Sequence, residues 1–296
     1  MIVSDAFEIR SLRTHKEYLA CVALQDETWG SHFSERVPAA ILKVSQRIGG
    51  VTAGAFDGDD RLMGFVFGMT GVENGRLVHW SDMLAVRPDA RDSGLGSRLK
   101  QYQRDAVRAI GVSVIYWTFD PLVARNANLN FTKLGVRAVE YVRDMYGAET
   151  DSVLHQGVGT DRLIVAWDIG DKHQPKSSER DPRRLLKGVD SATVLNREGL
   201  RIADSGFLLS GPEAPRFARI EIPLDIQRVQ AESLQSAAAW RESSRTSFLT
   251  AFAAGYEIAG FYPDRDADAG YYVMTQKDTS SVIGPTPHLP PATHQR

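Results

Sequence analysis

A strand that runs into a glycine-containing loop and then into a long helix is the feature that most constrains this chain. Residues 77–86 have strand character, and the loop after them passes through Arg91, Gly94 and Gly96. Apolar residues then recur at spacings of four, three, four and four, at Leu95, Leu99, Tyr102, Ala106 and Ile110. This period is that of one helix face. The segment therefore predicts a strand–loop–helix connection in an α/β unit.

The same loop has the chemistry of an anion cradle. Glycines let the backbone approach a bulky polyanion closely. The free N–H groups at a helix start, together with the helix dipole, hold phosphate charge. Neither competing phosphate motif fits, because the chain lacks the Gly-Lys-Ser/Thr of a Walker loop and a Gly-x-Gly-x-x-Gly after its first strand.

The remaining pattern predicts two units. Residues 1–169 read as strand, two helices, three strands, helix, strand, helix and two strands, which gives one mixed sheet with helices on both faces. Residues 170–189 are charged and read as a linker, residues 190–276 as a smaller α/β unit, and the proline-rich residues 277–296 as a flexible tail. Residues 248–261 echo residues 131–142 as helix, glycine and strand, either as a degenerate half-repeat or as a common connection.

Composition limits the partners. A net charge of −2 argues against nucleic acid as the partner. No apolar run is long enough for a membrane span, and no signal peptide is readable. The single cysteine, Cys21, suits a reducing cytoplasm. The seven histidines show no metal-ligand spacing, so we expect no metal site.

At Val86, Pro88, Arg91, Gly94 and Gly96 the sequence resembles the acyl-CoA motif of the GNAT superfamily of N-acyltransferases. The order of elements over residues 6–168 is also similar. The resemblance implies acetyl-CoA or another acyl-CoA as the donor, with pyrophosphate on the amides of residues 91–97 and the pantetheine arm along residues 84–86. The cofactor-binding residues would be Leu84, Val86, Arg91, Ser93, Gly94, Leu95, Gly96 and Ser97, joined by Asn126 and Asn130 on the helix after the next strand.

The later half is similar to a less-characterised, predicted-acetyltransferase branch of that superfamily, through Asp120-Pro121-Leu122 and the run from Gly159 to Leu163. Some genes related to that branch are linked with N-acylation of amino acids, including succinylation. The resemblance implies an amino-acid-like acceptor.

Residue chemistry suggests candidates for the reaction. Strand alternation puts Trp80, Asp82, Leu84 and Val86 on one face of the strand. Asp82 is therefore the first choice for the base that deprotonates the amine. The alternative is that Asp82 is an ordinary ion-paired carboxylate on the strand. Asp120 ends a strand and either binds substrate or caps the next helix. Trp80 and Trp117 read as pocket wall or core.

Phe131 departs from the family pattern, in which a tyrosine at that position protonates the departing thiolate. Tyr146 and Tyr116 are the substitutes, or the thiolate leaves unassisted. His155 could act as a base and Arg162 could clamp an acceptor carboxylate, or both could hold the loop before the last strand.

These observations favour a cytoplasmic acyl-CoA-dependent N-acyltransferase that acts on a small amine by direct transfer, with a second unit that covers the acceptor or forms a homodimer. The alternatives are a non-catalytic coenzyme A-binding module, which Phe131 favours, and O-acylation.

Overall fold

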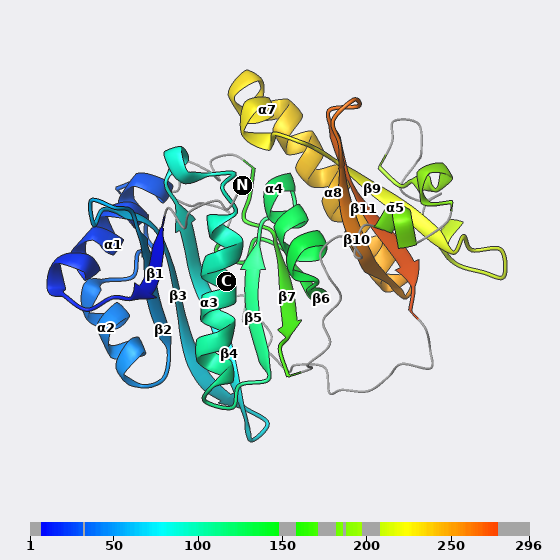
Figure 1. Cartoon of the computed structure of the whole chain (residues 1–296). Coiled ribbons are helices and arrows are strands. Elements are labelled where there is room, and N and C mark those ends of the chain that lie inside the picture. The colour runs from blue at the N-terminus through cyan, green and yellow to red at the C-terminus, as the bar shows by residue number, and fades with distance from the viewer. Residues whose placement is uncertain are drawn as a thin grey trace.

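The computed structural model describes residues 7–31, 33–147, 158–170, 182–185, 188–196 and 208–277. These residues form a seven-stranded sheet of order β1-β2-β3-β4-β5-β7-β6 and a four-stranded sheet of order β10-β11-β9-β8 (Figure 1). Both sheets are mixed and carry helices, so the α/β class expected from the sequence is confirmed.

The first sheet contains β1 (Glu8–Ser11), β2 (Val51–Phe56), β3 (Leu62–Glu73), β4 (Arg76–Val86), β5 (Val114–Phe119), β6 (Arg137–Val142) and β7 (Arg162–Asp168). Its helices are α1 (His15–Trp29), α2 (Ala39–Arg47), α3 (Leu95–Arg108) and α4 (Ala124–Ala127), with the π-helical segment η2 (Asn128–Leu134) directly after α4. The second sheet contains β8 (Thr193–Val194), β9 (Phe217–Pro223), β10 (Tyr256–Asp264) and β11 (Ala269–Gln276), with α7 (Ile226–Glu232) and α8 (Leu234–Ala253). A single-turn helix, α5 (Pro182–Leu185), precedes it within the expected linker.

Local sequence signals explain where several helices begin. Thr14 and Glu17 form the expected capping box at the start of α1. The single helix expected over residues 226–254 is two helices, because Ser233 adopts an extended conformation and accepts a hydrogen bond from the amide of Ser236. A capping serine between two helical runs is thus the signal that divides them.

The two faces of the first sheet have different cover. Helices α1 and α2 pack on one face around a core that includes Phe65, Phe67 and Met83. Helix α3 packs on the other face, where Leu95 and Leu99 join a larger core. Figure 1 shows α3 running alongside the strands in front of the first sheet, with α1 and α2 at the left of that sheet.

The second sheet repeats the arrangement of the last four strands of the first. β4 pairs with β5 in parallel and β7 lies antiparallel between β5 and β6, and the same holds for β8, β9, β11 and β10. Each unit ends a helix at a left-handed glycine, Gly135 or Gly255. The register of the next strand then shifts three residues later, after Ala138 and after Ile258. These shared details favour the half-repeat over a chance resemblance.

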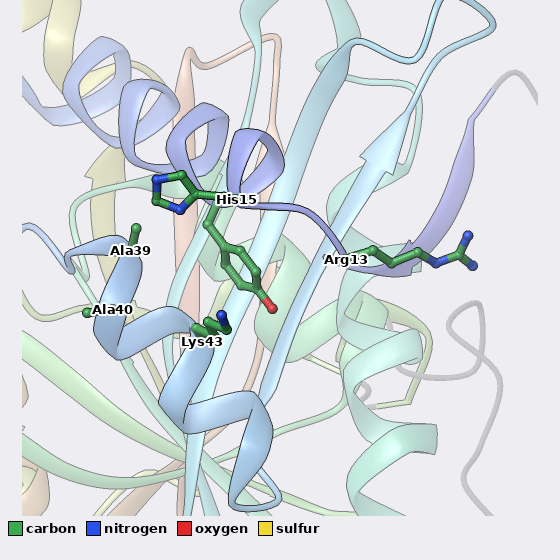
Figure 2. A pocket seen from close by; sticks show the side chains of 6 residues that line it. Arg13, His15, Ala39, Ala40 and Lys43 are labelled. Atoms are coloured by element: carbon green, nitrogen blue, oxygen red, sulfur yellow. The ribbon is translucent and has the colours of Figure 1, made fainter.

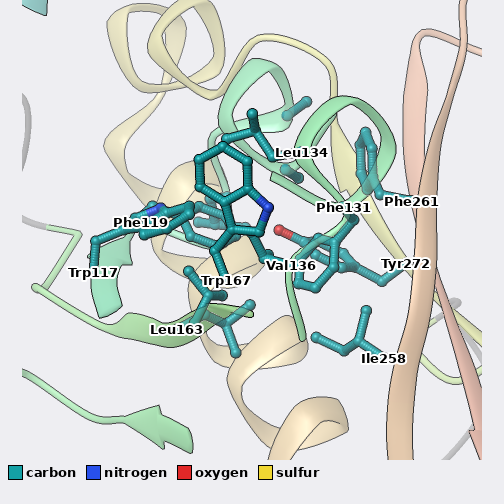
Figure 3. Packing of buried hydrophobic residues seen from close by; sticks show 14 of the residues in the cluster. Trp117, Phe119, Phe131, Leu134, Val136, Leu163, Trp167, Ile258, Phe261 and Tyr272 are labelled. Carbon is teal, nitrogen blue, oxygen red and sulfur yellow. The ribbon is translucent and has the colours of Figure 1, made fainter. Parts of the chain in front are cut away.

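The larger core is continuous between the units. Phe131 of η2 lies edge-on to Tyr272 of β11, and Phe248 of α8 stacks on Tyr141 of β6. The hydroxyl of Thr132 also donates a hydrogen bond to the carbonyl of Phe261, at 2.7 Å. Figure 3 shows Phe131 and Trp167 of the first unit among Ile258, Phe261 and Tyr272 of the second. Each unit therefore buries apolar side chains of the other.

Candidate active site

The strands β4 and β5 part inside the sheet. They pair in parallel only at His79 with Ile115 and at Trp80 with Tyr116. Beyond Trp80, β4 continues to Val86, and beyond Tyr116, β5 continues to Phe119. We call this opening the fork, with its vertex at Ser81 and Trp117, the first residues past the last pair. Among the described strands, the backbone of β4 on the side of the fork therefore has no partner beyond Trp80.

A bulge in β4 lies next to the vertex. Ser81 pairs with Gly68 and Met83 with Phe67, so Asp82 is the extra residue. The alternation that put Asp82 on the face of Leu84 and Val86 is therefore wrong. Met83 belongs to the core under α1 and α2, whereas Leu84 packs with the α3 core. His79 and Ser81, expected opposite Leu84, instead contact Gln103 and Lys100 of α3.

The start of α3 is open, as the anion-cradle interpretation requires. Gly94 precedes the helix with a left-handed φ of 80°, and no side chain caps the helix. A side chain added at Gly94 would meet nothing within 4 Å. Residues 91–94 are exposed, and Gly96 and Ser97 are half-buried, while the side chain of Leu95 is buried in the core. The hydroxyl of Ser93 donates to the carbonyl of Ala90, so its contribution is to shape the loop.

Sequence reasoning missed one cation at this loop. Arg125 of α4 has a lowered pKa, first because of burial and then because of the positive charge of Arg91. The charges of Asp225 and Asp92 act on this pKa in the opposite direction. An anion bound near both guanidinium groups would reduce the repulsion between them. The signal in the sequence was weak, because Arg125 is separated from the loop by a whole strand.

The carboxylate of Asp82 is solvent-accessible but partly enclosed. Its pKa is raised, first by loss of water around the carboxylate and also by the charge of Glu35, against a hydrogen bond from Trp80 that acts in the opposite direction. Glu35 lies in the connection between α1 and α2, so its charge acts on Asp82 from the part of the chain that covers the face opposite α3. A carboxylate with a raised pKa is a better proton acceptor for an ammonium group than an ordinary aspartate.

Asp120 does not cap α4 as one interpretation predicted, because the N-cap of that helix is Val123 and no side chain caps it. Its Oδ1 instead accepts from the amide of Leu122 at 2.8 Å, in the turn between β5 and α4. Its Oδ2 also accepts from Arg241 of α8 at 2.7 Å, and Arg162 lies 3.9 Å from the same oxygen. Burial lowers the pKa of Arg162 despite Asp120. The sequence offered no sign of Arg241, which comes from the second unit.

Tyr146 and Arg162 are brought together. The guanidinium of Arg162 lies 5.2 Å from the ring centre of Tyr146, whose hydroxyl is 3.2 Å from the hydroxyl of Thr118 on β5. Tyr116, the other candidate acid, belongs to the closed part of the fork and donates to Glu73 at 3.2 Å. His155 lies outside the described residues.

The two asparagines differ. Asn130 is buried and its side-chain oxygen accepts from the indole N–H of Trp117 at 3.2 Å, while Asn126 is half-buried. Phe131 is buried between Phe119 and Tyr272. The position where the sequence resemblance leads one to expect a tyrosine is therefore part of the core shared by the two units. Trp117 is a wall of the fork on the α3 side.

A buried polar cluster lies between α3 and β4, which the sequence analysis did not single out. Lys100 donates to the hydroxyl of Ser81 at 2.7 Å. His79 lies between Thr70 and Gln103, with ring nitrogens 3.0 Å from each. Because Thr70 donates to the carbonyl of Gly49, it accepts from Nδ1–H of His79, which leaves Nε2 to accept from Gln103. Burial lowers the pKa of His79 to about 3, so the imidazole is neutral.

Two surface pockets lie away from the fork. One, of about 310 Å³, is lined by Arg13, His15, Tyr18, Ala39, Ala40 and Lys43, and Figure 2 shows the side chain of Arg13 extending away from the others. The other, of about 250 Å³, lies between β6 and α8. Within the described ranges, no cluster of acidic, histidine or cysteine side chains could hold a metal ion. In the same residues, every helix is too short or too polar to cross a bilayer.

No protein-family model and no curated protein matches the chain. Several solved structures are similar to it. The ribosomal-protein-S18-alanine N-acetyltransferase of Escherichia coli is 18% identical, with a TM-score of 0.44, over 57% of this chain and 97% of its own. A phosphinothricin acetyltransferase of Sinorhizobium meliloti, solved with AcCoA, is 14% identical, with a TM-score of 0.45, over 58% and 94%. An acetyltransferase of the GNAT family from Streptococcus pneumoniae is 17% identical, with a TM-score of 0.44, over 54% and 98%.

These structural matches cover 54–58% of this chain and include acetyltransferases of the GNAT family. What this chain does must follow from its own residues.

Proposed function

We propose that this protein is an acyl-CoA-dependent N-acyltransferase that moves the acyl group of acetyl- or succinyl-CoA directly to a small amine, with amino acids as the first acceptors to test. One observation carries the proposal: the fork between β4 and β5 opens beside the uncapped, left-handed start of α3. The N–H groups at an uncapped helix start can bind phosphate. The free backbone groups of an open strand edge can form hydrogen bonds with an extended chain that contains amides.

The donor would use both features. Its pyrophosphate would lie on the amides from Gly94 to Ser97, between Arg91 and Arg125. The amide-bearing pantetheine arm would pair with the free edge of β4 at residues 84–86. The thioester would then lie near the bulge, since the arm runs from the start of α3 towards the vertex.

The acceptor would approach from the face of the sheet opposite α3. There Asp82 would take the proton from the ammonium group, with Trp80 beside it. Arg162 and Tyr146 would bind a carboxylate on the acceptor, and His155 remains a candidate second base. The amine nitrogen would attack the thioester carbonyl as the C–S bond breaks, and a thiol with a pKa near 8.5 leaves without a dedicated acid.

A second function is favoured by Phe131. A phenyl ring cannot donate a proton, and here it is buried against Tyr272 of the second unit. A coenzyme A-binding module without catalysis would keep the helix start and the fork and would lack turnover.

The two functions are separated by measuring binding and thiol release with the same protein. Calorimetry with coenzyme A tests the donor site, and release of free thiol from acetyl- and succinyl-CoA across a panel of amino acids and amines tests transfer. Binding with turnover supports the acyltransferase, and binding without turnover on every acceptor supports the module. Absence of binding rejects both, and a product cleaved by hydroxylamine would indicate O-acylation.

A further inference from the structure

Lys100 lies at the vertex of the fork. Its Nζ is 2.7 Å from the hydroxyl of Ser81 on β4 and 3.8 Å from the ring centre of Trp117 on β5. Ser81 and Trp117 are the first residues beyond the last pair of the two strands. The amine therefore spans the strands at the point where they begin to part.

The charge of Lys100 has no counterion in the described part of the chain. The side chain is 3% exposed, and its partners there are a hydroxyl and an aromatic face. The titratable neighbour is His79 of β4, which is neutral because burial keeps its pKa at about 3. A buried ammonium group without a carboxylate is costly, and burial lowers the pKa of Lys100 to about 7. An anion delivered to this point would relieve that cost.

The proposed donor reaches the vertex with its acyl end. Because the bulge adds one residue, Val86 and Ser81 lie opposite Gly64 and Gly68 of β3, four steps apart, which is about 13 Å of strand at 3.3 Å per residue. An arm that starts at the phosphate loop and follows the free edge of β4 runs towards the vertex. Whatever ends the acyl chain is therefore the part of the donor closest to Lys100.

We propose that the donor's acyl chain ends in a carboxylate, as in succinyl-CoA, and that Lys100 together with Ser81 selects it at the vertex of the fork. This inference rests on the proposed function and names its donor class. Lys100 takes no part in the transfer: the amine forms the new C–N bond, the C–S bond breaks to release the thiolate, and the proton goes to Asp82. The carboxylate at the tip is unchanged.

The test compares three donors that differ at the tip, using calorimetry on the full chain. Acetyl-CoA is short, butyryl-CoA has the length of the succinyl chain without its charge, and succinyl-CoA has both. We expect the wild type to bind succinyl-CoA at least tenfold more tightly than butyryl-CoA. Lys100→Met keeps most of the stem and removes the charge, and it should abolish this preference while leaving the affinity for coenzyme A unchanged.

Lys43→Met on α2 is the matched control, because it removes an exposed lysine from the other side of the sheet and should leave every affinity as in the wild type. Equal binding of butyryl- and succinyl-CoA by the wild type overturns the inference. The inference is also overturned if Lys100→Met lowers the affinity for all three donors equally. If Lys100→Met does not fold, Ser81→Ala allows the same comparison, and we expect it to reduce the preference for succinyl-CoA over butyryl-CoA by a smaller factor. Failure of coenzyme A itself to bind would instead reject the proposed function.

Discussion

At the scale of single residues, Asp82 is the side chain on which the proposed chemistry depends. Asp82→Asn should lower kcat by about a hundredfold and leave the affinity for coenzyme A within twofold, because the amide cannot accept the proton. The base works only when ionised, so the wild-type kcat should fall as the pH drops through the raised pKa of Asp82, above the range of an ordinary aspartate. Steady-state kinetics against pH measures both.

The control for this variant is Asp105→Asn, which neutralises an exposed carboxylate on α3 and should change neither kcat nor the pH profile. A rate that stays intact at every pH in Asp82→Asn would show that Asp82 serves the structure of the bulge.

Lys100 gives a prediction about stability that does not depend on any function. Its pKa is about 7 in the folded protein and about 10.4 in an unfolded chain, so the unfolded chain binds more protons between these values. The free energy of unfolding of the wild type should therefore rise with pH from about 7 to about 10, relative to Lys100→Met, by at most about 1.4 kcal/mol per pH unit. Urea titrations of both proteins across this range measure the difference, and a constant difference would contradict the buried, uncompensated charge.

At the scale of elements, the two ends of α3 offer a matched pair of substitutions. Gly94 and Gly111 have left-handed φ angles of 80° and 92°, and a side chain at either position meets nothing within 4 Å. Valine should therefore cost a similar amount of backbone strain at both, on the order of 1–2 kcal/mol. Only Gly94 adjoins the free N–H groups of the helix start.

Gly94→Val should accordingly weaken coenzyme A binding by about a hundredfold or more, whereas Gly111→Val should leave it within twofold. Calorimetry on the two variants, with stability measured alongside, separates the loss of the phosphate site from strain. An affinity unchanged by Gly94→Val would remove the phosphate-loop assignment.

The bulge in β4 shows how one residue changes the chemistry of an element. A strict two-residue period puts Asp82 on the donor side with Leu84, but the extra residue shifts the period and moves Ser81 and His79 to the α3 face. Bulges are common beside functional sites. The sequence contains no signal for this bulge: the hydrophobic pattern is not interrupted there, and position 82 is not a glycine. The bulge results from the register between β4 and β3.

At the scale of the whole molecule, the two units share a core. Asp161 accepts two hydrogen bonds from Arg245 of α8, both at 2.7 Å, and Tyr141 donates to the same carboxylate at 2.5 Å. The pKa of Asp161 is lowered because these hydrogen bonds outweigh the effect of burial. Arg241 likewise ties α8 to Asp120 at the end of β5. The second unit thus holds the strand ends that frame the fork.

Phe248→Ala tests this coupling. The phenyl ring is fully buried, stacks on Tyr141 and lies edge-on to Tyr272, so its removal should cost about 3–5 kcal/mol. Because the core is continuous, calorimetry should show one unfolding transition that shifts as a whole. The neighbouring Leu249 is exposed, and Leu249→Ala should change the stability by less than about 1 kcal/mol. Two transitions, with only one of them shifted, would show independent units.

The sequence by itself determined the elements whose signals are local. The capping box of α1, the glycine-opened start of α3 and the turns of the meander all depend on residues a few positions apart, so they could be predicted. The half-repeat was visible as an echo, although strand order was needed to support it.

Only the tertiary structure decided which distant residues meet. Lys100 reaches Trp117 across the fork, Arg125 approaches Arg91, and Arg241 binds Asp120 from 121 residues away. Such pairs are set by how helices and sheets pack and by strand register, and these depend on the summed burial of many side chains. The pattern of residues in one segment does not show which distant segment packs against it. The charged contacts at the vertex of the fork and between the two units therefore could not be predicted from the sequence.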